Sequence, residues 1–205
     1  MITSVAMNRP HGTTIVAVNK DGVTALVGDG QVSMGDTIVK RGAVKVRALA
    51  DGAVVAGFAG AVSDAFTLLD KFEGYLETYR GNLTRAAVET VKEWRTDRAL
   101  RNLEAMLIVA DHKQILTLSG VGDVIAPDEP VAAVGSGGAY AQAAATALLR
   151  HTDMDAEAIA RAALAIAAEI DVFTSGNATV LTVSAAGATG PENGGGDPVA
   201  EEGGA

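Results

Sequence analysis

Short β-branched runs separated by turn residues fill the first third of the chain. Val23–Val27 follows Thr14–Val18 across Asn19-Lys20-Asp21-Gly22, and an Asp-Gly pair favours the positive φ angles of a hairpin turn. The same pattern recurs in Thr37–Val39, Val44–Leu49 and Ala53–Ala59. It predicts a meander of antiparallel strands, which differs from the βαβ start of a nucleotide-binding domain.

A helical period replaces the strand pattern at Ser63. Apolar residues then recur every three or four positions as far as Tyr79, and Gly81 is placed to end the helix. The pattern predicts a second helix from about Thr84 to Leu100, with Val88, Val91 and Trp94 on its buried face.

Strands and then helices return in the second half of the chain. The predicted strands are Ala105–Ala110, Gln114–Leu118, Val131–Val134 and Thr179–Val183, and the predicted helices are Tyr140–Arg150 and Asp155–Ile170. Blocks of strands and blocks of helices favour an α+β fold over an alternating α/β fold. We expect a four-layer α-β-β-α sandwich.

Composition places this pattern in one domain. The chain has 205 residues, of which 48% are hydrophobic and 20% are charged, enough apolar mass for a single core. No apolar run is long enough for a membrane span, and Met1–Pro10 lacks the apolar stretch of a secretory signal, so we expect a cytoplasmic protein. Residues 184–205 contain seven glycines and four acidic residues, and we expect a disordered acidic tail there.

Charge and residue content exclude several classes of function. A net charge of −9 with scattered Lys and Arg argues against nucleic-acid binding. The chain has no cysteine, which excludes thiol nucleophiles and cysteine-bound zinc. Its three histidines, His11, His112 and His151, are far apart in sequence and are poor candidates for a Ser-His-Asp triad or a zinc site.

A nucleophile that carries its own base remains possible at Gly12-Thr13-Thr14. Cleavage before Thr13 would place a hydroxyl and a free α-amine on one residue, and an α-amine has a pKa near ~7.7–8. Lys45, between Val44 and Val46 in a predicted strand, is a candidate to tune that amine, and Asp29 is a turn carboxylate able to pair with it. Thr13-Thr14 can equally be two β-formers that begin a strand.

Six motifs together resemble one known family. They are Thr13-Thr14-Ile15-Val16-Ala17-Val18, Gly28-Asp29-Gly30-Gln31, Ala56-Gly57-Phe58-Ala59-Gly60, Asp64-Ala65-Phe66-Thr67-Leu68, Trp94-Arg95-Thr96-Asp97-Arg98 and Gly135-Ser136-Gly137-Gly138. In this order and spacing they resemble the HslV (ClpQ) family of bacterial proteolytic subunits over roughly Thr13–Val183. Gly135-Ser136-Gly137-Gly138 by itself looks like a phosphate loop, but the Gly-Lys-Ser/Thr that such a loop requires is absent.

The resemblance implies a fold, an activity and partners. It implies a proteasome-like sandwich of the N-terminal-nucleophile hydrolase type, assembled as two stacked six-membered rings around a closed chamber. It implies threonine-type endopeptidase activity on unfolded proteins fed by a hexameric ATPase, HslU, which uses the ATP. No organic cofactor is implied for this chain.

The resemblance also implies roles for particular residues. Thr13 is the nucleophile and its amine the base, Lys45 and Asp29 tune its ionisation, Ser136 assists proton movement, and the Gly57 N–H is an oxyanion donor. A family sodium site, made of main-chain oxygens, maps onto Ala168, Asp171 and Thr174 at the end of the last helix. Without the resemblance, Asp171 is an ordinary carboxylate at a helix end.

Two features depart from the family pattern. Residues 1–12 form a leader where many relatives have little before the threonine, and we predict cleavage of the Gly12–Thr13 bond by the assembled particle, with residues 13–183 as the protease domain. The tail after Val183 is not explained by the motifs. Two other functions stay open from the sequence, a self-processing amidase of the same fold and a catalytically silent ring subunit.

Overall fold

Two antiparallel sheets and four α-helices make up the part of the chain that the computed structural model describes, residues 12–60, 62–97, 100 and 105–190. The first sheet has the order β10-β1-β2-β11-β12, formed by β1 (Thr14–Lys20), β2 (Val23–Asp29), β10 (Val131–Gly135), β11 (Ala178–Ser184) and β12 (Gly187–Thr189). The second has the order β5-β6-β7-β8-β9, formed by β5 (Val46–Leu49), β6 (Val54–Gly60), β7 (Ala105–Ala110), β8 (Ile115–Ser119) and β9 (Val124–Ile125). Strands β3 (Val32–Met34) and β4 (Thr37–Lys40), which lie between β2 and β5 in sequence, form a separate two-stranded hairpin.

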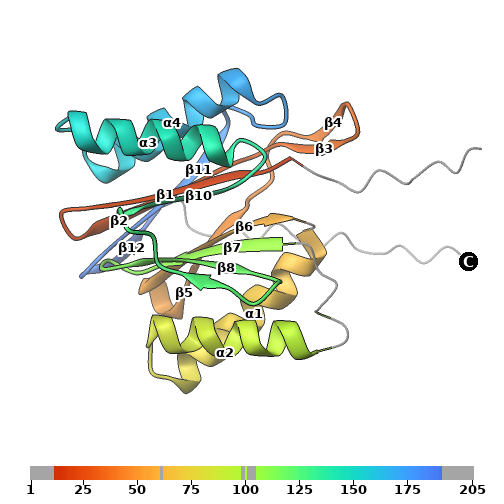
Figure 1. Ribbon diagram of the computed structural model, residues 1–205, viewed down its shortest axis with the longest axis vertical. Coiled ribbons are helices and arrows are strands. Elements are labelled where there is room, and N and C mark those ends of the chain that lie inside the picture. Colours follow the sequence, from red (N-terminus) through yellow and green to blue (C-terminus); the bar gives the residue numbers. More distant parts are fainter. Residues whose placement is uncertain (1–11, 61, 98–99, 101–104, 191–205) are drawn as a thin grey trace, which may run out of the picture.

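The helices lie on the outer faces of the two sheets (Figure 1). Helices α3 (Gly138–His151) and α4 (Ala156–Ile170) pack on the first sheet, and α1 (Val62–Thr78) and α2 (Leu83–Thr96) pack on the second. The inner faces of the sheets pack on each other. The α+β prediction is confirmed, and the layers follow in the order helices, sheet, sheet, helices.

Strand β1 shows how a run of apolar residues fits between two layers. Ile15 and Ala17 face the second sheet, while Val16 and Val18 face α3 and α4, because successive side chains of a strand point to opposite faces. All four side chains are fully buried. A strand buried on both faces reads as a continuous apolar run, and the β-branched character of Thr14–Val18 reflects that position.

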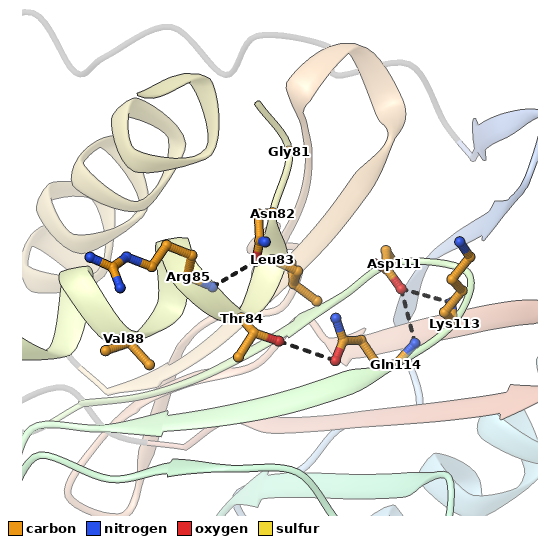
Figure 2. A pocket seen from close by; sticks show the side chains of 9 residues that line it. All are labelled: Gly81, Asn82, Leu83, Thr84, Arg85, Val88, Asp111, Lys113 and Gln114. Atoms are coloured by element: carbon orange, nitrogen blue, oxygen red, sulfur yellow. Dashed lines mark hydrogen bonds between the residues drawn. The ribbon is translucent and has the colours of Figure 1, made fainter. Parts of the chain in front are cut away.

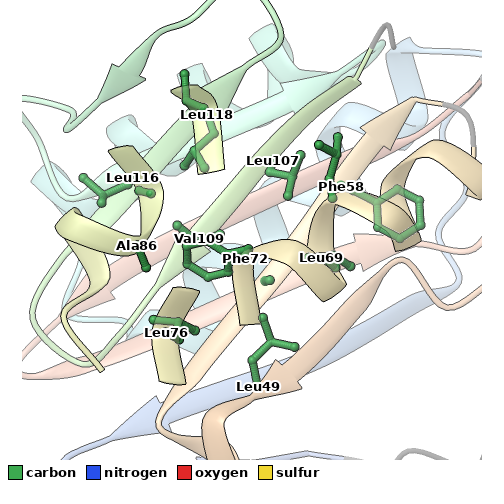
Figure 3. Close-up of a cluster of buried hydrophobic side chains, with 14 of the residues drawn as sticks. Leu49, Phe58, Leu69, Phe72, Leu76, Ala86, Leu107, Val109, Leu116 and Leu118 are labelled. Atoms are coloured by element: carbon green, nitrogen blue, oxygen red, sulfur yellow. The ribbon is translucent and has the colours of Figure 1, made fainter. Parts of the chain in front are cut away.

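The outer core of the second sheet is the largest apolar cluster described. Side chains from α1 and α2 cover β6, β7 and β8, as Figure 3 shows for Phe72 and Leu76 of α1 against Leu107 and Val109 of β7. Trp94 of α2 belongs to the same cluster and is fully buried. The helical period read from the sequence therefore marks the face that packs on the sheet.

Some predicted boundaries are wrong. Helix α2 ends at Thr96 rather than Leu100. Strand β5 begins at Val46, so Lys45 precedes the strand and Val44 is exposed. Strands β3, β9 and β12, each two or three residues long, were not predicted. Runs this short do not establish a period of two, so their pattern cannot be told from a loop.

The predicted start of the disordered tail is also wrong. Strand β11 extends to Ser184, and a tight turn returns the chain as β12, where Thr182 pairs with Thr189. Gly187 takes a φ of 106° in this hairpin, a value that glycine adopts without strain. The low apolar content of residues 184–190 was taken to indicate disorder. Backbone pairing between β11 and β12 instead orders this segment at the edge of the sheet. The rest of the predicted tail, residues 191–205, and the leader residues 1–11 lie outside the described residues.

Candidate active site

Thr13 lies immediately before β1, between the described residue Gly12 and the first sheet. Its side chain is buried, and its hydroxyl Oγ1 donates a hydrogen bond to the Gly12 carbonyl oxygen at 2.7 Å. The peptide bond between Gly12 and Thr13 is intact in this chain, so the Thr13 nitrogen is an amide and not a base. The Thr13 hydroxyl therefore lies beside the carbonyl group that precedes it in the chain.

Lys45 points at the same carbonyl. Its amine Nζ donates to the Gly12 oxygen at 2.8 Å, to Asp29 Oδ1 at 2.9 Å and to the carbonyl of Gln31, and the side chain is only 1% exposed. Burial lowers the pKa of Lys45 below the ordinary lysine value, and the charge and hydrogen bond of Asp29 oppose that shift. All three ammonium hydrogens have acceptors, as a buried lysine requires.

Asp29 holds together three segments that are distant in sequence. Besides the Lys45 amine, its carboxylate accepts from the backbone N–H groups of Thr14 at 2.8 Å, Gln31 at 2.8 Å and Ser175 at 3.2 Å. The side chain is fully buried. A buried carboxylate is stable only when its lone pairs are satisfied, and four donors do this for Asp29. The predicted turn carboxylate is in fact the last residue of β2.

The loop between β10 and α3 wraps the Thr13 carbonyl. The Ser136 N–H donates to the Thr13 oxygen at 2.9 Å, and the Ser136 hydroxyl lies 3.4 Å from the same oxygen. Gly135 has a φ of 99°, and a Cβ at this position would lie 1.8 Å from the Thr13 oxygen. Only glycine permits this approach, which is why the glycine-rich segment lies at the threonine.

Gly57 lies in the middle of β6, opposite Val46 of β5. A Cβ at Gly57 would lie 2.8 Å from Cγ2 of Ile15, so the missing side chain lets the two sheets approach behind the threonine. The neighbouring Phe58 N–H donates to the Lys45 carbonyl at 3.2 Å. Gly57 is therefore placed next to the backbone of Lys45, and its packing alone accounts for a glycine.

Known proteins that resemble the chain decide its family. The proteasome-subunit family model matches residues 10–183. The ATP-dependent protease subunit HslV of Desulfovibrio desulfuricans is 60% identical over 174 residues, which cover 84% of this chain and 98% of that protein. The protein of the same name from a Caulobacter species is 61% identical over 175 residues, covering 83% of this chain and 93% of the relative. The chain belongs to the HslV family.

Structural comparison agrees with this HslV assignment. The crystal structure of eukaryotic HslV from Trypanosoma brucei superposes with a TM-score of 0.80 at 46% sequence identity, covering 83% of this chain and 99% of that one. The chain is thus a proteolytic subunit of an ATP-dependent protease and a threonine peptidase of the proteasome type. The resemblance read from the six motifs is confirmed.

The three residues predicted to bind sodium in this HslV-family chain lie at the end of α4. Ala168 is in the last turn, Asp171 is the C-cap, and Thr174 follows in a turn in which its N–H donates to the Asp171 carbonyl at 3.1 Å. The last turn of α4 contains no basic residue, whereas α3 ends in Arg150 and His151. Carbonyl oxygens at a helix end carry the negative end of the helix dipole, an environment that favours a cation.

A hollow in the surface lies elsewhere on the subunit, at the start of α2 (Figure 2). Its polar side chains serve local structure, because Asn82 Oδ1 accepts the Arg85 N–H at 2.9 Å and caps the helix. Asp111 Oδ1 accepts the N–H groups of Lys113 at 2.7 Å and Gln114 at 2.9 Å in the β7–β8 turn. No predicted site residue lines this hollow.

Sequence reasoning did not single out four residues that shape the site. Gly12 supplies the carbonyl that meets both Thr13 and Lys45, and Gln31 supplies a second acceptor for Lys45. Thr14 follows Thr13 in the chain, and its hydroxyl accepts the N–H of Gly137. The position of Thr14 and Gly137 inside two of the six motifs was the only available signal. Their side-chain and backbone partners depend on segments brought together by folding.

None of the helices described here is long and apolar enough to cross a membrane.

Proposed function

We propose that Thr13 becomes the first residue of the mature subunit and that its hydroxyl attacks substrate peptide bonds while its freed α-amine accepts the hydroxyl proton. The observation that carries the proposal is the convergence of Thr13 Oγ1 and Lys45 Nζ on one carbonyl group, at 2.7 Å and 2.8 Å. The hydroxyl thus lies beside the carbonyl it would attack, and Lys45 can polarise that carbonyl by donating to its oxygen.

Maturation would be the first reaction of this site. Thr13 Oγ1 attacks the Gly12 carbonyl carbon, the bond from that carbon to the Thr13 nitrogen breaks, and the hydroxyl proton ends on the nitrogen. The product is an ester between Gly12 and the Thr13 oxygen. Water then hydrolyses the ester, releasing residues 1–12 with a carboxylate at Gly12 and leaving Thr13 with a free amine and a free hydroxyl.

Peptide hydrolysis would follow the same course with a substrate carbonyl. The α-amine takes the hydroxyl proton as Oγ1 attacks, and that proton passes to the leaving amine as the ester forms. Water hydrolyses the ester and restores Thr13. The positive charge of Lys45 would favour the neutral α-amine and the alkoxide, and Asp29 holds Lys45 in place.

Ser136 and Gly57 would assist these steps. The Ser136 hydroxyl lies 3.4 Å from the Thr13 carbonyl oxygen, and in a mature chain it would carry a proton to or from the nearby α-amine. The N–H of Gly57 would donate to the oxyanion of the tetrahedral intermediate. Both roles come from the family resemblance, and the position of each residue beside Thr13 or Lys45 is compatible with them.

Assembly and partners follow from family membership. The order of layers supports a four-layer sandwich of the N-terminal-nucleophile hydrolase type. We infer that the subunits form two stacked hexameric rings in the cytoplasm, and that a hexameric HslU ATPase unfolds proteins and feeds them to the chamber. A chamber would confine hydrolysis to chains that the ATPase admits.

A sodium ion is proposed at the end of α4, held by the main-chain oxygens of Ala168, Asp171 and Thr174. When bound, the ion would neutralise carbonyl groups that lack helical amide partners. These oxygens belong to the segment whose Thr174 and Ser175 contact Thr14 and Asp29. The ion would thus stabilise the loop behind the nucleophile without touching substrate.

Replacement of Thr13 tests the proposal. In Thr13→Ala the leader should remain attached, and hydrolysis of a fluorogenic peptide should fall by more than roughly 10³-fold, with or without HslU and ATP, because both the attacking oxygen and the base are lost. Thr13→Ser is the matched control, and it should be processed and active because serine keeps a hydroxyl and an amine. If Thr13→Ala cleaved the peptide and unfolded casein at the wild-type rate, this mechanism would be excluded. A wild-type particle inactive on both would indicate a silent ring subunit.

A further inference from the structure

Three side-chain oxygens meet behind the nucleophile, at the residue that follows it. The hydroxyl Oγ1 of Thr14 lies 2.6 Å from Thr174 Oγ1, and Thr174 Oγ1 lies 2.6 Å from the carboxylate Oδ2 of Asp171. On its other side, Thr14 Oγ1 accepts the N–H of Gly137 at 2.9 Å. Thr14 is fully buried and Thr174 is 5% exposed, so water does not substitute for these bonds.

Counting hydrogens gives the chain of bonds a direction. The single hydroxyl hydrogen of Thr174 is donated to Asp171, so Thr174 can only accept from Thr14. Thr14 then donates to Thr174 and accepts from Gly137. The bonds run from the Gly137 N–H through two hydroxyls to a carboxylate, and every donor in the chain has a partner.

Gly137 is where this chain meets the loop at the nucleophile. A Cβ at Gly137 would lie 2.6 Å from both hydroxyl oxygens and 3.2 Å from Asp171 Oδ2, so no side chain fits there. The adjacent Ser136 N–H holds the Thr13 carbonyl at 2.9 Å. The Thr14 hydroxyl therefore connects the Ser136–Gly137 loop to the turn after α4. Thr13, which precedes Thr14, is bound by the same loop.

We propose that Thr14 is a positioning residue, whose hydroxyl fixes Thr13 and Ser136 relative to each other through Gly137 and Thr174. The inference rests on the proposed role of Thr13. The Thr14 hydroxyl donates to Thr174 and accepts from Gly137, so its hydrogen is already engaged and it takes no part in proton transfer with substrate. Its loss would leave the Gly137 N–H without its acceptor and Thr174 without its donor.

The test compares Thr14→Val, which keeps the shape and removes the hydroxyl, with Thr14→Ser, which keeps the hydroxyl. We expect Thr14→Val to lower kcat on a fluorogenic peptide by about 10²-fold, with KM changed by less than about twofold, because a displaced nucleophile affects the reaction more than binding. Reaction of Thr13 with a peptide vinyl sulfone should slow by the same factor. Thr14→Ser should restore both rates to within about threefold of wild type.

A matched control is available at the edge of the first sheet. Thr182 Oγ1 lies 2.6 Å from Thr189 Oγ1 in β11 and β12, the same pair of groups at the same distance. Thr182→Val removes this bond and should leave kcat, KM and labelling of Thr13 unchanged. The control separates loss of a Thr–Thr bond in general from loss of the bond behind the nucleophile.

Thr174→Val breaks the same chain from the other side and serves if Thr14→Val does not assemble. It should also lower kcat, and the double variant Thr14→Val/Thr174→Val should be no slower than the slower single variant, because both remove one connection. Wild-type kcat in folded, processed Thr14→Val or Thr174→Val would overturn the inference. An active Thr13→Ala would instead refute the proposed function, so the two failures are distinguishable.

Discussion

Lys45 is the residue whose surroundings bear most on the proposed chemistry. It is a buried amine with three acceptors, of which one is a carboxylate and two are carbonyls, including that of Gly12. Burial favours the neutral amine and Asp29 favours the ammonium ion, with burial the larger effect on the pKa. Release of Gly12 would remove one acceptor and leave the amine facing the new α-amine of Thr13.

The lowered pKa of Lys45 predicts how stability depends on pH. Between the folded pKa and the ordinary lysine pKa of 10.5, the unfolded chain binds more protons at this site, so its contribution to stability rises as pH rises. We expect the thermal midpoint of unprocessed Thr13→Ala to rise relative to that of Thr13→Ala/Lys45→Met as the pH increases toward 10.5. Thermal unfolding of both proteins across this range measures the difference.

The double variant also leaves Asp29 buried without a cation, which should cost about 3–5 kcal/mol where Lys45 is charged in the parent protein. If the difference between the thermal midpoints of the two proteins narrowed as pH rose, the effect of Asp29 on the pKa of Lys45 would be larger than the effect of burial. The pKa of Lys45 would then be raised. The pKa argument for a buried, poised amine would then be wrong.

At the scale of elements, the end of α4 connects the fold to the site. The turn that follows this helix contains Thr174, which contacts Thr14, and Ser175, whose N–H contacts Asp29. The helix ends without a basic side chain, although its C-cap Asp171 adds a negative charge. A cation bound there would stabilise the turn through its carbonyl groups, in addition to the hydrogen bonds that Thr174 and Ser175 make to Thr14 and Asp29.

Exchange of sodium for choline at constant ionic strength tests that cation. Sodium at ten times the Kd of the site should add about 1.4 kcal/mol to the stability, or roughly 3–6 °C to the thermal midpoint of a domain of this size. Choline is too large for carbonyl ligands and serves as the control for ionic strength. Equal midpoints in the two salts would remove the sodium proposal and leave the hydrogen bonds alone to hold the turn.

The sequence predicted the long elements well and the connections poorly. Strands β1 and β7 are continuous apolar runs and helix α4 has a strong helical period, and all three lie within a few residues of their predicted positions. Lys45 was placed inside a strand because Val44 and Val46 flank it, but Val44 is exposed and the chain turns there to bring the amine to Gly12. Local pattern does not contain this information, since the acceptors come from distant segments.

The pairing of Lys45 with Asp29 was predicted by charge balance and is confirmed at 2.9 Å. The chain from Gly137 to Asp171 was not predicted, because serine, threonine and glycine are common in loops and nothing in their order indicates a shared bond. Family resemblance supplied the roles of Thr13, Ser136 and Gly57, which stay predictions.

For the whole molecule, the close approach of the two sheets fixes the position of β1, the strand that follows Thr13. Ile15, two residues after Thr13, fills the space over Gly28 of its own sheet and Gly57 of the facing sheet, where a Cβ would lie 2.7 Å and 2.8 Å from it. Ile15 thus packs against both sheets on the inner face of β1, while α3 and α4 cover its other face. Thr13 stands at the end of a strand that cannot shift without opening the core between the sheets.

The intact mass of the purified, proteolytically active particle tests the central claim most directly. The account predicts a subunit that begins at Thr13, with all of residues 1–12 removed, and it predicts that chemical blocking of this new amine abolishes peptidase activity. A fully active particle whose subunits all retain Gly12 would contradict the account, because an amide nitrogen at Thr13 cannot serve as the base.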